Sequence, residues 1–200
     1  MPLPPPDDYI SPLARAFAAV TSHRRNEADM IVAMLRAELP ARSRRLPINR
    51  NLQVAVLRRD RFSCRYCGMR TIPVPVLRAA SLIWPEELPF NRNWRTDVTH
   101  PVYAACAATI DHLQPRAHGG SNSELSNLVT ACWPCNLQKS EFTLHRLGWA
   151  LAEITSSAWD GLIYAYPDLW EEGHPNATAG DVRYHLAWLA AFFPPGSTST

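Results

Sequence analysis

Three polar side chains in the stretch 109–140 are of the types that could together hydrolyse a phosphodiester: Asp111, His112 and Asn136. Such a reaction needs a base to deprotonate water and a hard cation to neutralise charge on the phosphoryl and leaving oxygens. A histidine can be that base at neutral pH, and carboxylate and amide oxygens suit Mg²⁺ or Mn²⁺. The alternative for His112 is a hydrogen-bonded structural role, and an Asp-His pair alone does not decide between the two.

Four of the five cysteines form two Cys-x-x-Cys pairs, Cys64/Cys67 and Cys132/Cys135. The first residues contain neither a basic segment nor an apolar one, so we expect no export signal and a cytoplasmic location. In such a chain, paired Cys-x-x-Cys motifs indicate metal ligands rather than disulfides. Two pairs present four thiolates, the ligand set of structural zinc, whereas one pair alone could be redox-active. The fifth cysteine, Cys106, lies in a small apolar run and is expected to be buried.

The elements expected around these residues form a ββα unit. They are a strand over 105–113, a polar loop over 114–126, a short return strand over 128–130 and a helix with Pro134 in its first turn. Neighbouring strand residues point to opposite faces. Asp111 and His112 can therefore serve one site only if the strand twists, bulges or ends there, and Pro115 favours an ending. Zinc bound by the flanking cysteine pairs could supply roughly 10–16 kcal/mol of apparent binding energy to this unit.

The 200 residues are enough to bury a core, and 46% hydrophobic and 19% charged residues are ordinary for a globular protein. No window approaches the ~18 consecutive apolar residues of a membrane helix, so we expect no membrane partner. Five further helices are expected. Two begin at Ser11 and Asn26, two lie over 49–60 and near 76–84, and the last ends before Pro194. The expected organisation is a disordered Pro-rich segment (1–12), a helical extension with a basic connector (13–46), a core (47–145) with an irregular insertion (71–105), a helical Trp-rich region (146–193) and a disordered tail (194–200).

Charge is distributed unevenly along the chain. Residues 1–100 contain 16 basic and 9 acidic residues, whereas residues 101–200 contain 4 and 9. Nine arginines against the single acid Asp60 fall within 41–70. This patch would attract phosphate, and the alternative is a solvated face or an intramolecular partner in the acidic tail. The candidate nucleic-acid contacts are Arg58, Arg59, Arg61, Arg116 and Lys139.

The chain resembles the HNH endonuclease family, also called the ββα-metal nucleases. The resemblance covers about residues 49–140 and consists of the order Cys-x-x-Cys, Asp-His, Gly-Gly, Ser-Asn-Leu and Cys-x-x-Cys-Asn-x-x-Lys. It implies an α+β fold, with a zinc-stabilised ββα-metal core and helical N- and C-terminal extensions. The insertion 71–105 departs from the family's minimal pattern, in which the first cysteine pair closely precedes the hairpin.

The resemblance also implies a role for each matching residue. His112 corresponds to the general base, and Asp111 and Asn136 correspond to the ligands of a catalytic divalent metal, Mg²⁺ or Mn²⁺. Asn127 corresponds to the middle Asn, which braces the loop by hydrogen bonds. Asn136 stands where some members carry His, which makes nickel or zinc a less natural catalytic metal.

The favoured interpretation is a metal-dependent endonuclease acting on DNA, with 5′-phosphate and 3′-hydroxyl products implied by the resemblance. The alternative is a non-catalytic zinc-knuckle module that binds nucleic acid or protein. A third possibility is a scaffold whose Trp-rich tail is the working surface. The sequence indicates neither a protein partner nor an oligomeric state.

Overall fold

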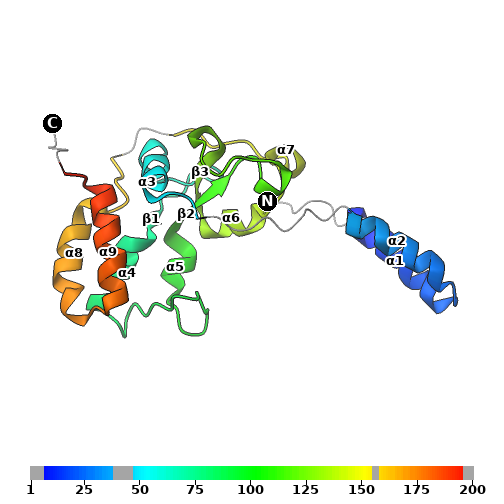
Figure 1. Cartoon of the computed structure of the whole chain (residues 1–200), viewed down its shortest axis with the longest axis horizontal. Helices are drawn as coiled ribbons and strands as arrows, with labels where there is room; N and C mark the ends of the chain where they lie inside the picture. The colour runs from blue at the N-terminus through cyan, green and yellow to red at the C-terminus, as the bar shows by residue number, and fades with distance from the viewer. Residues whose placement is uncertain (1–6, 38–46, 155–157, 196–200) are drawn as a thin grey trace.

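The computed structural model describes residues 7–37, 47–154 and 158–195. Figure 1 shows two parts, a hairpin of two helices and a larger body in which helices surround a small sheet. The expected basic connector, with the first six residues of the Pro-rich segment, lies outside the described residues. Among the residues described, no helix is long and apolar enough to cross a membrane.

The hairpin consists of α1 (Asp7–Thr21) and α2 (Arg25–Ala37). Its buried residues include the small Ala16 and Ala19 on α1, and Ala28 and the larger Ile31 on α2. The predicted start of the first helix at Ser11 is wrong, because α1 already begins at Asp7.

Helix α3 (Arg50–Arg59) begins the larger body and leads into the first cysteine pair. The side chain of Asn49 caps it by accepting hydrogen bonds from the N–H groups of the first turn. One face of the helix buries Val54, Val56 and Leu57 in the core. The helix was predicted at 49–60, and this prediction is confirmed within one residue at each end.

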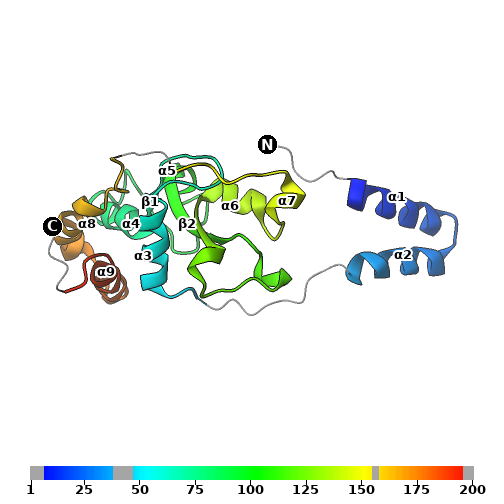
Figure 2. The same ribbon diagram turned by 90° about the horizontal axis from the view of Figure 1, so that it is seen from above.

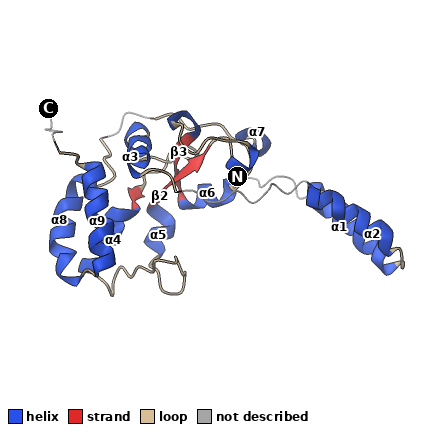
Figure 3. Ribbon diagram, in the orientation of Figure 1, coloured by secondary structure: helices blue, strands red, loops and turns tan. Residues whose placement is uncertain are grey.

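The sheet has three strands in the order β1-β2-β3. They are β1 (Ile72–Pro73), β2 (Ala107–His112) and β3 (Leu128–Cys132), and Figure 3 shows the sheet among the helices. β1 pairs with β2 in parallel and β2 with β3 antiparallel, with Asp111 opposite Val129. The chain continues from β3 directly into α6 (Trp133–Lys139). The α+β fold and the ββα unit are thus confirmed.

The insertion is more regular than its prolines suggest. Besides β1 it contains α4 (Val74–Ile83) and most of α5 (Pro101–Cys106), each with a proline in its first turn. The expected strand at 105–113 therefore begins two residues later, because α5 extends to Cys106. Cys106 itself is only half-buried, so the expectation of a buried residue is wrong.

The C-terminal part contains α7 (Leu144–Leu147), α8 (Tyr166–Gly173) and α9 (Ala179–Phe192), with short 3-10 helices at 163–165 and 174–176. Two more short 3-10 helices, at 116–118 and 125–127, lie between β2 and β3. A capping box between Thr178 and Asp181 begins α9. Figure 2 shows α8 and α9 beside α3 and α4. Trp170 and Trp188 are buried in the core that these helices share. The Trp-rich tail therefore supplies core rather than an exposed aromatic surface at these two positions.

Candidate functional site

The sulfur atoms of Cys64, Cys67, Cys132 and Cys135 form a cluster, the four-cysteine cluster, in which all lie within 4.8 Å of one another. Cys67 Sγ and Cys132 Sγ are 3.8 Å apart. A tetrahedron with Zn–S bonds of about 2.3 Å has an edge of about 3.8 Å. All five cysteines, each within the described residues, are free thiols. The donor set and its spacing therefore fit a tetrahedral thiolate site for a metal such as zinc.

Electrostatics within the four-cysteine cluster favour a bound cation. The hydrogen bond between the Cys64 and Cys132 thiols lowers the pKa of Cys64 to about 5 and raises the pKa of Cys132. Burial raises the pKa of Cys135 to about 12. One thiolate is stabilised while its neighbours resist ionisation, since like charges this close repel each other. A divalent cation would remove that repulsion and deprotonate the set.

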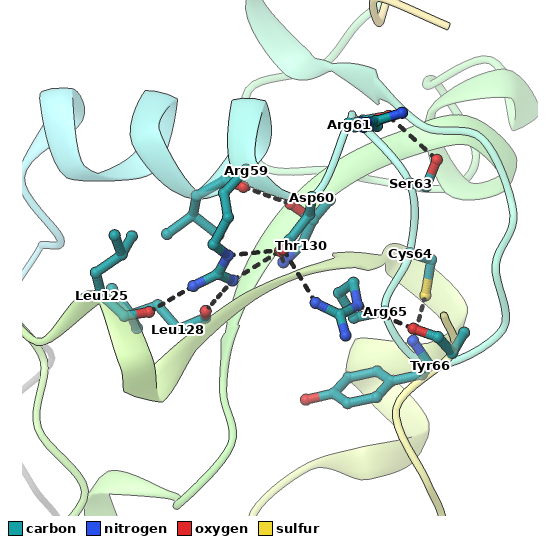
Figure 4. A network of polar contacts seen from close by, with 12 residues as sticks. Arg59, Asp60, Arg61, Ser63, Cys64, Arg65, Tyr66, Leu125, Leu128 and Thr130 are labelled. Atoms are coloured by element: carbon teal, nitrogen blue, oxygen red, sulfur yellow. Dashed lines mark hydrogen bonds and ion pairs between the residues drawn. The ribbon is translucent and has the colours of Figure 1, made fainter. Parts of the chain in front are cut away.

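A buried carboxylate fixes the first cysteine pair on the sheet (Figure 4). Asp60 is fully buried, and it accepts hydrogen bonds from the Thr130 N–H at 2.7 Å and from the Arg59 guanidinium at 2.8 and 2.9 Å. Arg65, which lies within the first Cys-x-x-Cys, is 3.3 Å from the same carboxylate. Its backbone N–H donates to the Thr130 carbonyl at 2.8 Å. The cysteine pair is thereby attached to both α3 and β3.

Asp111 lies on β2 with its carboxylate in a buried polar network. Its Oδ2 accepts a hydrogen bond from the Tyr66 hydroxyl at 2.6 Å and lies 3.1 Å from Lys139 Nζ. Lys139 is fully buried and also donates to the His112 carbonyl at 2.6 Å. Burial, reinforced by the Asp111 charge, raises the pKa of Tyr66 far above its usual range, so the phenol stays protonated and donates. Both partners engage Oδ2, and Oδ1 is the oxygen that a metal would use.

His112 is the last residue of β2 and is half-buried. Its Nε2 lies 3.0 Å from Asn122 Oδ1. Because an amide oxygen can only accept, this contact places the proton on Nε2 and leaves Nδ1 as the basic nitrogen. Desolvation lowers the pKa of His112 below its ordinary value. The imidazole is therefore neutral at neutral pH, as a base must be.

Asn136 lies in the first turns of α6, on the helix that packs against β2. Its Nδ2 donates to Thr109 Oγ1 at 2.7 Å, and that hydroxyl donates to the Ala131 carbonyl at 2.8 Å. The contact with Thr109 is thus made by the amide nitrogen of Asn136. The amide oxygen, which is the atom that a hard cation needs, is not the one engaged by Thr109.

Asp111, His112 and Asn136 line one cleft of about 760 Å³. Neighbouring residues within a strand point to opposite faces. Because β2 ends at His112, Asp111 and His112 nevertheless both reach this cleft. Trp133 forms another part of the wall, and it stacks on Trp94 of the insertion with ring centroids 4.6 Å apart. The oxygen donors and the neutral imidazole in this cleft fit a hard divalent cation beside a base.

The loop between β2 and β3 is held by the side chain of Asn127. Its Oδ1 accepts from the Gln114 N–H at 2.8 Å, and its Nδ2 donates to the carbonyls of Gln114 and Ser121 at 3.1 and 2.9 Å. A Cβ atom at Gly120 would lie 1.7 Å from the Gln114 carbonyl oxygen. Only glycine fits this close approach. The loop that carries Asn122 is thus fixed to the end of β2.

A known family accounts for the segment that supplies most of this cleft. Residues 99–142 match the HNH endonuclease family. The segment includes Asp111, His112 and Asn136 of the HNH unit, whereas the first cysteine pair lies before it. No curated protein and no solved structure matches the chain. The HNH match indicates a nuclease-type domain, and the fold completes its four-cysteine cluster from outside the matched residues.

The candidate phosphate contacts predicted from the sequence are in very different positions. Lys139 is fully buried and paired with Asp111, so the prediction of a surface contact is wrong. Arg59 donates to Asp60 and to two backbone carbonyls at 125 and 128, which use its guanidinium within the fold and contradict a free phosphate contact. Arg58 is exposed and donates to the Phe192 carbonyl at 2.7 Å.

The other two candidates are placed differently. Arg61 is exposed, and Arg116 lines the cleft itself. These two remain the predicted contacts to phosphate. Arg61 follows Asp60, the C-cap of α3, and its positive φ of 49° belongs to the turn toward the first cysteine pair.

Three residues that contact the candidate site residues were not predicted from the sequence. Asn122, which contacts His112, lies two residues after Gly119-Gly120 in the polar loop. The position of this amide in the loop next to His112 was the sequence signal that could have identified it. Thr109 is two residues before Asp111 and so shares its strand face. Tyr66 lies between Cys64 and Cys67, and its hydroxyl contacts Asp111.

Proposed function

We propose that the chain is an HNH endonuclease that hydrolyses phosphodiester bonds of DNA, with zinc in the four-cysteine cluster and Mg²⁺ or Mn²⁺ at the cleft. The observation that carries this proposal is the convergence of Asp111, His112 and Asn136 on one cleft within the HNH-matched segment. A purely zinc-binding module has no use for a desolvated neutral imidazole beside two oxygen donors.

In this proposal His112 is the general base. The Nδ1 atom accepts a proton from a water molecule while Asn122 holds Nε2–H. The water oxygen attacks phosphorus in line, the bond from phosphorus to the 3′-oxygen breaks, and the departing oxygen is protonated by solvent. The products are a 5′-phosphate and a 3′-hydroxyl. A divalent metal held by Asp111 and Asn136 would neutralise the charge that develops on the phosphoryl and leaving oxygens.

DNA is the proposed substrate because the cleft is open to the surface near basic residues. Arg116 lines it, and the first half of the chain has 16 basic residues against 9 acidic ones. Arginine forms forked hydrogen bonds to phosphate oxygens. Contacts of this kind hold a backbone without reading bases, so we expect cleavage with little sequence preference.

Cleavage of supercoiled plasmid by the zinc-loaded full chain tests this proposal. Nicked or linear product should form with Mg²⁺ or Mn²⁺ and should be absent with EDTA. Ligation of the products by a DNA ligase reports 5′-phosphate and 3′-hydroxyl ends. A protein that binds plasmid yet never nicks it with Mg²⁺, Mn²⁺, Ca²⁺ or Ni²⁺ would be the binding module instead.

A further inference from the structure

Tyr66 contacts both metal-binding parts of the molecule. It lies between Cys64 and Cys67, and its backbone N–H is 3.4 Å from Cys64 Sγ. Its hydroxyl, at the other end of the side chain, donates to Asp111 Oδ2 at 2.6 Å. The ring is buried at 3% exposure and packs on Trp149, with centroids 5.5 Å apart. A single rigid side chain thus spans from the four-cysteine cluster to the cleft.

We propose that Tyr66 is a positioning residue that couples occupancy of the four-cysteine cluster to the binding of a divalent metal at Asp111. The inference rests on the proposed function only for the role of Asp111 as a metal ligand. It extends that function because zinc would then do more than hold the fold together. It would set the affinity of the catalytic site.

The two partners of Asp111 Oδ2 come from different elements. Lys139 is on α6, the helix that also carries Cys135, and it donates to the His112 carbonyl at 2.6 Å. Tyr66 is within the first cysteine pair, which a metal shared with Cys132 and Cys135 would hold in place. A shift of the first cysteine pair would therefore change the contact between Tyr66 and Asp111 directly. Two donors on Oδ2 fix the orientation of the carboxylate and leave Oδ1 for a metal.

The contact has the properties of an outer-shell hydrogen bond. Such bonds to metal-binding carboxylates fix their orientation, and their loss costs about 10- to 100-fold in metal affinity. The Tyr66→Phe variant removes one hydroxyl and keeps the ring that packs on Trp149. It should therefore retain the cysteine geometry and lose only the bond to Asp111.

The chain offers a matched control in Tyr103. This residue is buried at 1% exposure, and its hydroxyl donates to the Leu77 carbonyl at 2.9 Å, away from both metal-binding parts. Tyr103→Phe therefore removes an equally buried phenol hydrogen bond without touching Asp111. Any loss of metal affinity shared by both variants would reflect general loosening of the fold.

The experiment is a Mn²⁺ titration of the zinc-loaded full chain, followed by the electron paramagnetic resonance of free Mn²⁺. Tyr66→Phe should keep one zinc per chain and bind Mn²⁺ about 10- to 100-fold more weakly, whereas Tyr103→Phe should match the parent. Cleavage by Tyr66→Phe should fall at limiting Mn²⁺ and recover at saturating Mn²⁺. Unchanged Mn²⁺ affinity in Tyr66→Phe with one zinc bound would overturn the inference.

Asp111→Asn separates this inference from the proposed function. If Asp111→Asn loses Mn²⁺ binding and Tyr66→Phe does not, the metal site stands and the coupling is refuted. If the parent binds no Mn²⁺, both fail. A second measurement covers the case in which Tyr66→Phe does not fold. The ¹¹³Cd resonance of the cadmium-substituted parent should shift on saturation with Mg²⁺, because coupling between sites is reciprocal. An unmoved resonance contradicts the coupling.

Discussion

Replacement of Asp60 by alanine should destabilise the fold more than any exposed acidic substitution. The carboxylate is fully buried and receives hydrogen bonds from Arg59 and from the Thr130 N–H, with Arg65 also at 3.3 Å. Its removal leaves the backbone donor of Thr130 unpaired and two cations without their partner, and breaking a buried pair costs about 3–5 kcal/mol. At about 2–4 °C per kcal/mol for a chain of this size, the melting temperature should fall by about 6–20 °C.

The assay is thermal unfolding of the zinc-loaded chain, with zinc content measured in parallel. Asp97→Ala is the matched control, because Asp97 pairs with Arg95 at the surface with more than half of both side chains exposed. Pairs of this kind contribute about 0–1 kcal/mol. Asp60→Asn should fall between the two, since it keeps the shape and loses the charge. A loss for Asp60→Ala no larger than for Asp97→Ala would refute the view that this carboxylate anchors the first cysteine pair.

Two further predictions concern the cleft. Asn122→Ala should slow cleavage by at least about tenfold, although less than removal of the base, because His112 keeps its nitrogen but loses its orientation. Since the Asn122 bond raises the pKa of His112, its loss should also move the acid limb of the pH–rate profile to lower pH. An unchanged limb and rate would exclude the orienting role. Lys139→Met should destabilise the fold by about 3–5 kcal/mol, because it leaves the Asp111 carboxylate buried without a counter-charge. Added Mn²⁺ should restore more stability to Lys139→Met than to the parent by replacing the lost cation, and thermal unfolding with and without Mn²⁺ measures both effects.

Local patterns in the sequence predicted the ββα unit and the four-cysteine cluster. Short-range signals were enough there, because Pro134 marks the start of α6 and each Cys-x-x-Cys forms its own tight turn. In the insertion, the helix predicted near 76–84 is confirmed by α4, whereas β1 and α5 were not predicted. Pro75 and Pro101 occupy the first turns of α4 and α5, where the missing N–H costs nothing.

The roles of charged residues could not be predicted from sequence, because they depend on contacts between distant segments. Arg59 donates hydrogen bonds to backbone carbonyls more than sixty residues away in the sequence. A run of arginines does not indicate such contacts. Lys139 has the residue type of a phosphate contact, but α6 directs it beneath β2 toward Asp111. Burial of a charged side chain is set by tertiary packing, and only the fold shows it.

We propose His112 as the base in a cleft that hydrolyses phosphodiesters. The most direct measurement is the rate of plasmid cleavage at saturating Mn²⁺ by the parent, by His112→Ala and by His145→Ala, whose histidine is exposed on α7 outside the cleft. We expect His112→Ala to retain zinc and DNA binding while its cleavage rate falls by about 10²- to 10⁴-fold. We expect His145→Ala to cleave like the parent. Cleavage by His112→Ala at the parental rate would contradict the proposal.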